Sequence, residues 1–426
     1  MFFDRPEFGT QAFLVHIQQD DSTPQELNEL VLSAGLVPVG YLVARKRNPD
    51  PKTYIGSGKL AEIKAQARED EAGLIIFDQD LTPTQERNLE AFLECRILGR
   101  TGLILEIFAQ RARTHEGKLQ VELAQLQHAS TRLVRGWTHL DRQRGGSGRG
   151  QGAAIGVTGA GETQLEADQR MISDRIKHVS QRLQRVQKQR AQNRRSRQRA
   201  DVKTVSLAGY TNAGKSTLFN RLCESDVHAA DQLFATLDPT LRELQLPIIG
   251  KAILTDTVGF IRQLPHGLVD AFRATLEEVK QSDLIVHVVD GSSEERDLQM
   301  TEVDLVLEEI KASDVPQLLI YNKIDLIEEG PRVDRDADGQ PTRVWVSSLT
   351  GEGIPELIEA LSQRLSHDVV EPWLKLNPAE GQLRSALFDL DAVLEEEVKD
   401  DGMIYMHVRI EEHRLNRLLS RFSSRQ

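Results

Sequence analysis

The chain has 426 residues, 39% of them hydrophobic and 28% charged, which allows packed cores and excludes a globally disordered protein. Cys95 and Cys223 both fall in segments predicted to be helical, which excludes a disulfide framework and predicts a reducing, cytoplasmic setting. The net charge of −12 argues against nucleic acid as a general partner, but residues 131–200 hold 16 Lys and Arg against 5 Asp and Glu. One basic segment on an acidic body is therefore expected to meet a polyanion.

The N-terminal residues 1–9 carry acidic residues and a proline where a signal peptide needs basic and then apolar residues. The longest apolar runs, such as Leu284–Val289, suit strands and fall far below the roughly 18 residues of a membrane span. We therefore expect a soluble, cytoplasmic protein without a membrane span.

Residues 1–112 alternate strand-like and helix-like segments and are predicted to form a small α/β domain. The expected strands are Ala12–Ile17, Leu36–Ala44 and Leu74–Phe77, and the expected helices start near Ser22 or Thr23, cover Lys59–Ala72 and follow Thr82-Pro83. The string Gly56-Ser-Gly-Lys59 matches half of a phosphate loop but lacks its first glycine. A glycine turn before a helix is the favoured interpretation, and a second nucleotide site is the alternative.

Residues 113–200 are predicted to form a basic helical hairpin. Apolar residues spaced three, four or seven apart define two heptad seams, Leu119, Leu123, Leu126 and Leu133 in the first helix and Leu165, Ile172, Ile176, Val179, Leu183 and Val186 in the second. Two such helices joined by one loop are expected to pack antiparallel. Thr163 and Glu166 have the spacing of a capping box, and the second helix would extend over roughly 55 Å if it continued to Arg199.

The loop between these helices, 145–161, contains eight glycines and no acidic residue, and Arg142, Arg144 and Arg149 lie in or beside it. Arginines bind phosphates and glycines allow close backbone approach, which favours an RNA-binding tip over a flexible linker. The segment 156–163 (GVTGAGET) superficially matches a phosphate loop, but Glu162 occupies the position of the phosphate-binding lysine. A second nucleotide motif is therefore excluded there.

Residues 201–368 are predicted to form a nucleotide-binding α/β domain. A strand-like run leads into Gly209–Ser216 (GYTNAGKS), which matches the phosphate-loop motif and is followed by a predicted helix. In such a loop the backbone N–H groups surround the β-phosphate at a helix N-terminus. Lys215 is predicted to bind the β- and γ-phosphates, and Ser216 is predicted to bind Mg²⁺.

Two further segments are expected to sense the γ-phosphate. Asp256–Gly259 (DTVG) follows a strand expected over 248–254, so Asp256 is predicted to hold Mg²⁺ through water and Gly259 to donate its N–H to the γ-phosphate. Phe234–Thr240 occupies the position of switch I. Thr236 is preferred over Thr240 as the threonine that completes the Mg²⁺ shell.

The last motifs favour guanine over adenine. Asn322–Asp325 (NKID) follows a predicted strand, and the Asp325 carboxylate is suited to accept two hydrogen bonds from the N1 and N2 edge of guanine. Lys323 is expected to lie over the base, and Ser347–Leu349 resembles the last guanine-contacting loop. The predicted nucleotide-binding residues are Gly209, Tyr210, Thr211, Asn212, Ala213, Gly214, Lys215, Ser216, Thr217, Phe234, Ala235, Thr236, Leu237, Asp238, Asp256, Thr257, Val258, Gly259, Asn322, Lys323, Ile324, Asp325, Ser347, Ser348 and Leu349.

The chain resembles the HflX family of translation-factor-related GTPases along nearly its whole length. The strings that carry the resemblance are Tyr54–Lys59, Gly159–Leu165, Gly209–Ser216 and Phe234–Thr240. The resemblance implies a Mg²⁺-dependent enzyme that hydrolyses GTP to GDP and phosphate. It also implies binding to the large ribosomal subunit and its rRNA, splitting of stalled ribosomes, and a helical arm that approaches the peptidyl transferase region.

Two positions qualify the expected catalysis. Many GTPases place a water-orienting glutamine after the DxxG motif, whereas this chain has Phe260, which predicts slow intrinsic hydrolysis and acceleration by a partner, with the ribosome as the leading candidate. Asn212 resembles the asparagine with which potassium-stimulated GTPases help to hold K⁺. A hydrogen bond that stabilises the loop is an equally weighted interpretation of Asn212.

Residues 369–426 are predicted to form a small α+β domain without a chemical motif. Its expected elements are a helix over Glu380–Phe388, strands over Ala392–Val398 and Met403–Ile410 joined by an Asp401-Gly402 turn, and a helix over His413–Phe422. His407 and His413 are interpreted as surface or packing residues.

The fold class is therefore α/β: a P-loop GTPase domain, preceded by a small α/β domain and a long antiparallel hairpin and followed by a small α+β domain. The leading hypothesis is a monomeric GTPase that binds the large ribosomal subunit and promotes dissociation or rescue of ribosomes. The alternatives are a signalling switch whose hairpin binds a protein effector, and an RNA-remodelling NTPase that uses the N-terminal domain.

Overall fold

The structure is a computed structural model that describes residues 7–18, 24–45, 50–136, 164–199, 202–223, 233–234, 236–237, 240–247, 249–262, 273–366, 369–390, 392–399, 402–411, 415 and 418–419. The glycine-rich loop 145–161 with its neighbouring arginines, the capping residue Thr163, and the site positions Ala235 and Asp238 lie outside these ranges. Most of the helix expected over His413–Phe422 also lies outside them.

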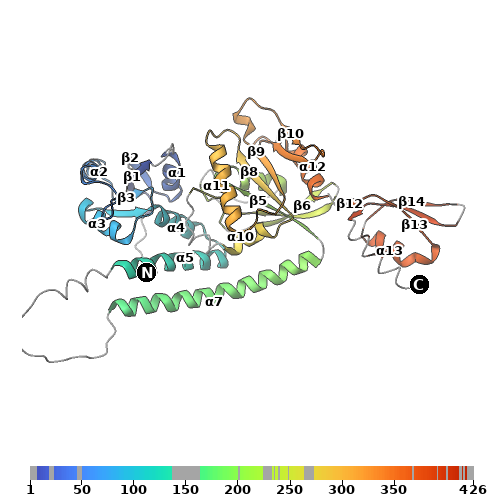
Figure 1. Cartoon of the computed structure of the whole chain (residues 1–426), viewed down its shortest axis with the longest axis horizontal. Helices are drawn as coiled ribbons and strands as arrows, with labels where there is room; N and C mark the ends of the chain where they lie inside the picture. Colours follow the sequence, from blue (N-terminus) through green and yellow to red (C-terminus); the bar gives the residue numbers. More distant parts are fainter. Residues whose placement is uncertain are drawn as a thin grey trace, which may run out of the picture.

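The N-terminal domain is a parallel sheet covered by helices on both faces (Figure 1). Its strands are β1 (Gln11–Gln18), β2 (Val37–Arg45), β3 (Leu74–Phe77) and β4 (Arg96–Gly99), in the order β2-β1-β3-β4. Its helices are α1 (Gln25–Ser33) and α4 (Arg100–Arg111) on one face and α2 (Ser57–Glu69) and α3 (Pro83–Leu93) on the other. The Thr82 capping box begins α3, as its Thr-Pro signal indicates. Cys95 lies between α3 and β4, so its predicted helical setting is wrong.

The arm consists of α5 (His115–Gly136) and α7 (Gln164–Arg199), which run side by side beneath the N-terminal domain and the domain that follows the arm in Figure 1. The ion pairs Arg175–Glu122 and Arg190–Glu116 join low numbers on one helix to high numbers on the other, so the helices are antiparallel. The predicted seams form one apolar cluster that contains Leu119, Leu123, Leu126, Ala129, Ile172, Val179 and Leu183. The side chains of Leu133, Leu165 and residues 193–199 lie outside the described part.

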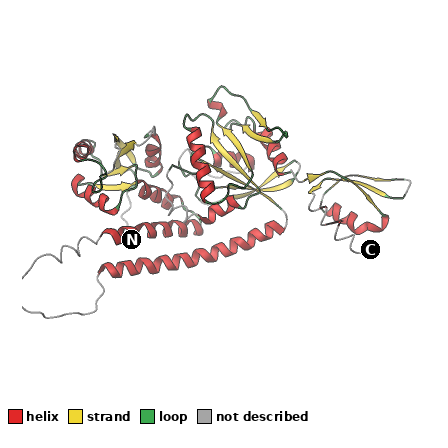
Figure 2. Ribbon diagram, in the orientation of Figure 1, coloured by secondary structure: helices red, strands yellow, loops and turns green. Residues whose placement is uncertain are grey.

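The third domain is built around a large sheet covered by helices (Figure 2). Its seven strands run in the order β10-β11-β9-β8-β5-β7-β6 and are parallel except for the two outermost strands. The strands are β5 (Lys203–Gly209), β6 (Thr240–Leu246), β7 (Gly250–Asp256), β8 (Leu284–Asp290), β9 (Gln317–Asn322), β10 (Arg332–Arg335) and β11 (Pro341–Trp345). Helices α8 (Lys215–Cys223) and α12 (Ile354–Leu365) cover one face, and α10 (Arg273–Lys280) and α11 (Arg296–Glu309) cover the other. The short 3-10 helix η1 (Ile324–Leu326) follows β9. The strand expected over 248–254 begins at Gly250 instead and continues to Asp256.

The C-terminal domain is an antiparallel sheet, β13-β15-β14, packed on α13 (Gly381–Asp389). Its strands are β13 (Trp373–Leu376), β14 (Val393–Val398) and β15 (Ile404–Val408), with the two-residue strands β12 (Val369–Val370) and β16 (Ile410–Glu411) paired beside them and η2 (Pro378–Glu380) before α13. The strand expected to reach Ile410 therefore ends at Val408, and Ile410 pairs with another strand. His407 stacks on Trp373 with ring centroids 4.8 Å apart, in agreement with a packing role.

The N-terminal and third domains share one hydrophobic core. The cluster formed by α1, α4 and one face of the N-terminal sheet also contains Leu233, Phe234, Leu237, Val258 and Ile261, which belong to the third domain. Phe234, Leu237 and Val258 belong to the two segments expected to sense the γ-phosphate, and Leu233 and Ile261 lie directly beside them. The N-terminal domain therefore packs directly against the predicted switches.

Candidate nucleotide-binding site

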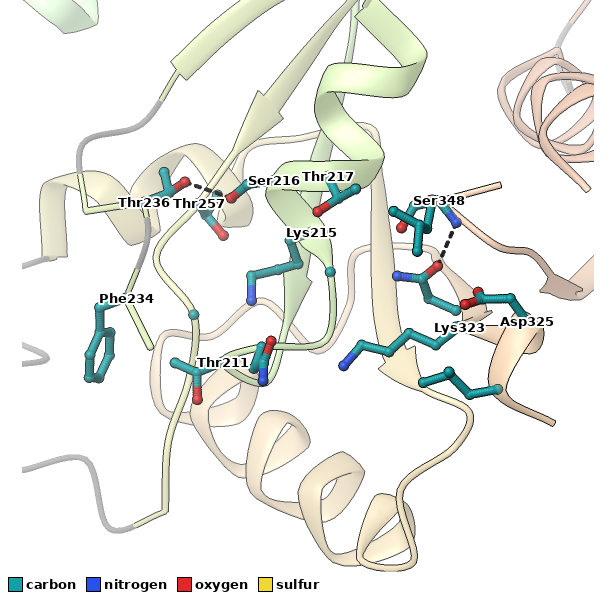
Figure 3. Close-up of a pocket in the computed structure, with 16 residues that line it drawn as sticks. Thr211, Lys215, Ser216, Thr217, Phe234, Thr236, Thr257, Lys323, Asp325 and Ser348 are labelled. Carbon is teal, nitrogen blue, oxygen red and sulfur yellow. Dashed lines mark hydrogen bonds between the residues drawn. The ribbon is translucent and has the colours of Figure 1, made fainter. Parts of the chain in front are cut away.

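A cleft of about 370 Å³ lies at the carboxyl ends of the central parallel strands, where open α/β sheets bind their ligands (Figure 3). The strands β5, β7 and β9 end at Gly209, Asp256 and Asn322, so three predicted motifs converge on one edge. The residues that line the cleft are Thr211, Asn212, Gly214, Lys215, Ser216, Thr217, Phe234, Thr236, Thr257, Gly259, Asn322, Lys323, Asp325, Leu326, Ser348 and Leu349.

The phosphate loop wraps the N-terminus of α8. Gly214 has a φ of +89°, and a Cβ there would lie 2.2 Å from Asn322 Nδ2, so only glycine fits. Lys215 is buried, and its Nζ donates to the carbonyl oxygens of Gly209 at 3.0 Å and Tyr210 at 2.6 Å. Burial lowers the pKa of Lys215 to about 8. The nearby charge of Asp256 opposes this shift, and a phosphate would provide a second anionic partner for the buried ammonium.

Three oxygen-bearing side chains meet beside the loop. Asp256 Oδ2 accepts hydrogen bonds from Ser216 Oγ at 2.9 Å and Thr236 Oγ1 at 2.7 Å. The two hydroxyl oxygens are 2.7 Å apart, as the dashed line between Ser216 and Thr236 marks in Figure 3. Asp256 Oδ1 is buried without a hydrogen-bond partner in the described part of the protein. Burial raises the pKa of Asp256, and these hydroxyl donors and Lys215 oppose that rise. Hard oxygen ligands with one free carboxylate oxygen fit Mg²⁺. Thr240, the alternative switch threonine, is instead the first residue of β6.

The NKID segment is fixed to the loops around it. Asn322 Nδ2 donates to the carbonyl of Ala213 at 2.8 Å, and Asn322 Oδ1 accepts from the backbone N–H of Ser348 at 2.9 Å. Ser347 Oγ donates to Asp325 Oδ1 at 2.5 Å. Asn322 therefore joins the phosphate loop to the last predicted guanine loop, while Asp325 and Lys323 face the cleft in Figure 3.

Most predicted site residues line the cleft, and the remainder have identifiable positions. The predicted residues that do not line it, apart from the undescribed Ala235 and Asp238, are Gly209, Tyr210, Ala213, Leu237, Asp256, Val258, Ile324 and Ser347. Five of these hydrogen-bond to residues that line the cleft: Gly209, Tyr210, Ala213, Asp256 and Ser347. Leu326 lines the cleft but is absent from the prediction; its position directly after the NKID motif was the available signal. The half-motif Gly56–Lys59 lines neither described cavity, and Lys59 forms an ion pair with Glu62 on the surface of α2.

Tyr210 points away from the cleft toward the N-terminal domain. Its hydroxyl donates to Glu26 Oε1 at 2.7 Å and accepts from the backbone N–H of Arg262 at 2.8 Å. Arg100 completes this junction, because its Nη2 lies 2.9 Å from Glu26 Oε1 and donates to the carbonyl of Arg262 at 3.1 Å. A polar network therefore ties α1 and α4 to the phosphate loop and to the segment after DTVG.

Switch I is held by the same domain. Phe234 has a φ of +57° and packs its ring edge-on against Phe108 of α4, with centroids 4.6 Å apart. The backbone N–H of Leu233 donates to Ser33 Oγ at 3.0 Å.

Phe260, directly after DTVG, is 1% exposed and lies in the apolar cluster under α10 and α11. Its ring therefore occupies the domain core and does not face the cleft.

A phosphate loop at a strand–helix junction, a buried aspartate beside the phosphate-loop serine, and an NKID segment at the neighbouring strand end together define a P-loop GTPase. Comparisons with known proteins agree. Family models match residues 21–109 as "GTP-binding GTPase N-terminal", 111–197 as "GTP-binding GTPase Middle Region", 204–323 as "50S ribosome-binding GTPase" and 332–426 as "HflX C-terminal domain".

Similar curated proteins carry the same family name. The chain is 53% identical to GTPase HflX of Escherichia coli K12 over 413 residues, which cover 96% of this chain and 95% of that protein. It is 46% identical to GTPase HflX of Magnetococcus marinus over 358 residues, covering 84% and 81%. Among solved structures, a GTP-binding protein from Sulfolobus solfataricus in complex with GDP matches with 24% identity and a TM-score of 0.44 over 84% of this chain and 99% of that chain.

The chain belongs to the HflX family of GTPases, and it hydrolyses GTP to GDP and phosphate. GTPases generally use Mg²⁺, which fits the oxygen ligands described above. In the part of the chain that the structure describes, no helix is both long enough and apolar enough to span a membrane.

Proposed function

We propose that this GTPase binds the large ribosomal subunit through its helical arm and promotes the dissociation or rescue of ribosomes. The observation that carries the proposal is the charge of α7, which has eleven Lys and Arg against three Asp and Glu over its 36 residues. Arg185 and Lys188 are exposed on this helix, whereas the chain as a whole has a net charge of −12. A cationic rod on an acidic body suits the phosphate backbone of rRNA.

The nucleotide site would time this engagement. Lys215 and the phosphate-loop N–H groups bind and orient the phosphates, and Thr236 and Gly259 sense the γ-phosphate. Mg²⁺, held by Ser216, Thr236 and Asp256, the last through water, would neutralise phosphate charge. Asp325 selects guanine. The residues of DTVG and switch I also pack on the N-terminal domain, which continues into the arm, so the sensing segments and the proposed rRNA-binding surface belong to one connected body.

The test is co-sedimentation of the full chain with ribosomal subunits in the presence of a non-hydrolysable GTP analogue or GDP. We expect binding to the large subunit with the analogue, weaker binding with GDP, and acceleration of GTP hydrolysis by ribosomes. Replacing Lys177, Arg185 and Lys188 by glutamine should weaken binding and flatten its salt dependence, because each lost phosphate contact removes one released counterion. The same change at Lys52, Lys59 and Arg68 in the N-terminal domain, which also removes three positive charges, is the matched control. Failure to co-sediment in either nucleotide state would favour a signalling switch with a protein effector.

We further propose that K⁺ assists hydrolysis beside Asn212. Asn212 lines the cleft, where its side chain could help to hold K⁺. Its φ of +61° is a conformation that asparagine tolerates, so Asn212 could instead serve only to stabilise the loop. Hydrolysis faster in KCl than in NaCl, with the difference lost in Asn212→Gly, would support K⁺ binding. Glycine keeps the backbone conformation, so equal loss of activity in both salts would assign Asn212 to loop stability instead.

A further inference from the structure

An ion pair lies directly beside the predicted guanine pocket. Lys323 Nζ is 2.7 Å from Asp290 Oδ2, and both side chains are largely buried, with 26% and 17% of their surface exposed. Asp290 is the last residue of β8 and Lys323 follows β9, and the two strands pair in register at Asp290 and Asn322. Asp290 belongs to none of the nucleotide motifs.

The carboxylate of Asp290 is itself immobilised. Its Oδ1 accepts hydrogen bonds from the backbone N–H of Ser292 at 3.0 Å and from Ser292 Oγ at 2.6 Å, which leaves Oδ2 for Lys323. The backbone N–H of Gly291 donates to the carbonyl of Asn322 at 2.8 Å. A Cβ on Gly291 would lie 2.9 Å from that carbonyl oxygen, so glycine permits the two strand ends to approach this closely.

The lysine is held at both ends as a result. Its backbone has a φ of +66°, which sets the direction in which the side chain leaves the chain, and Asp290 fixes the ammonium at the far end. A free lysine side chain loses more rotamer entropy than most side chains when it is ordered. A lysine already ordered before the ligand arrives avoids most of that loss on binding.

We propose that Asp290 is a positioning residue for guanine-nucleotide binding: it holds Lys323 extended along the cleft so that its stem packs on the face of the base. The proposal rests on the proposed assignment of Lys323 and Asp325 to the guanine pocket. Asp290 and Ser292 form a brace behind that pocket. Asp290 acts through Lys323 on the face of the purine and should affect all guanine-like bases equally. Asp325 acts on the edge of the base and should affect the preference between bases.

The first experiment measures equilibrium affinity for GTP, GDP and ITP in the full chain, with turnover at saturating GTP. Asp290→Asn should weaken binding of all three nucleotides by the same factor, roughly tenfold, because a partly buried charge-assisted contact is lost while the edge of the base is untouched. The turnover number should stay within about twofold, since Asp290 contacts neither the phosphates nor Asp256. Ser292→Ala should shift affinity in the same direction by a smaller factor. Glu329→Gln, which breaks the exposed ion pair with Arg332, is the matched control.

A double-mutant cycle with Lys323→Met separates positioning from a general structural role. Once Lys323 is methionine, Asp290→Asn should have no further effect on affinity. An undiminished effect in that background, an unchanged affinity in the single variant, or an increase in affinity would each overturn the proposal. Asp325→Asn tests the underlying assignment separately, because it should abolish the preference for GTP over ITP, which lacks the 2-amino group. If that preference survives, the assignment of the guanine pocket fails independently of Asp290.

Discussion

Single residues explain what the catalytic site provides and what it lacks. Ser216, Thr236 and Asp256 form a compact hydrogen-bonded group, while the carbonyl oxygens of Gly209 and Tyr210 hold the Lys215 ammonium. Phe260 occupies the position where a glutamine would orient water, and its ring is buried in the core of the domain. The absence of a water-orienting side chain at this position is therefore built into the packing of the domain.

Phe260→Gln should not create a faster enzyme. The backbone at 260 is fixed by hydrogen bonds with Gly209 and Thr211, so a glutamine would point into the apolar cluster. We expect the free energy of unfolding to fall by about 3 kcal/mol, from the lost ring and the buried amide. Turnover without ribosomes should remain well below one per second. Single-turnover hydrolysis and urea unfolding measure the two effects, and a tenfold gain in rate would contradict this account.

The stability of the nucleotide-free protein should depend on pH through Lys215. Its pKa is about 8 in the folded protein and near 10.5 when exposed, so the unfolded chain binds more protons between these values. Stability should therefore rise with pH in that window, by about 2 kcal/mol between pH 8 and 10 for this one group. Urea unfolding of wild type and Lys215→Met isolates the effect. Equal pH dependence in both proteins would assign it to other groups, and saturating Mg-GDP should reduce it in wild type.

At the scale of elements, local patterns predicted the parts of the fold with strong signals. The phosphate loop and the NKID segment are motifs that each follow a predicted strand. The heptad spacing of their apolar residues predicts the helices α5 and α7. By contrast, β4 and α4 join directly within the segment 96–108, whose two short apolar runs are separated only by residues 99–102, and periodicity alone does not show there where a strand ends and a helix begins. The sequence assigned Tyr210 to the nucleotide, but its hydroxyl binds Glu26, 184 positions away, and no local pattern encodes such a contact.

The arm should depend on its apolar seam for stability. Ile172 is 1% exposed between α5 and α7, whereas the adjacent Met171 is 51% exposed. Ile172→Ala should lower the free energy of unfolding by about 2–4 kcal/mol, because it leaves a cavity, and Met171→Ala should change it by less than about 0.5 kcal/mol. Chemical unfolding followed by circular dichroism compares them. Similar losses for the two variants would show that the seam does not carry the stability of the hairpin.

At the scale of the whole molecule, packing and hydrogen bonds join the nucleotide site to the N-terminal domain. Switch I, the phosphate loop and the residues after DTVG all contact α1 or α4, through Phe108, Ser33, Glu26 and Arg100. Binding that orders these segments should therefore stabilise helices outside the nucleotide domain.

Hydrogen exchange should detect this coupling. Adding Mg-GDP to wild type should protect backbone amides of α1 and α4, and Tyr210→Phe should reduce that protection, because it removes one donor and one acceptor from the junction, at a cost of about 1–3 kcal/mol. Tyr321→Phe is the control, since its hydroxyl contacts only Met300 within the same domain among the interactions described. Identical protection in wild type and Tyr210→Phe would contradict the coupling.

The helix α7 ends at Arg199 and β5, which leads into the phosphate loop, begins at Lys203. At about 1.5 Å per residue, the 36 residues of α7 span about 54 Å, and because α7 packs along α5 the two helices would tilt together. A tilt of only about 5° of the arm at its nucleotide-domain end would move the far end by about 5 Å, roughly one helical turn. Small displacements around the phosphates would thus produce movements about as long as a side chain at the end of α7 far from the nucleotide domain.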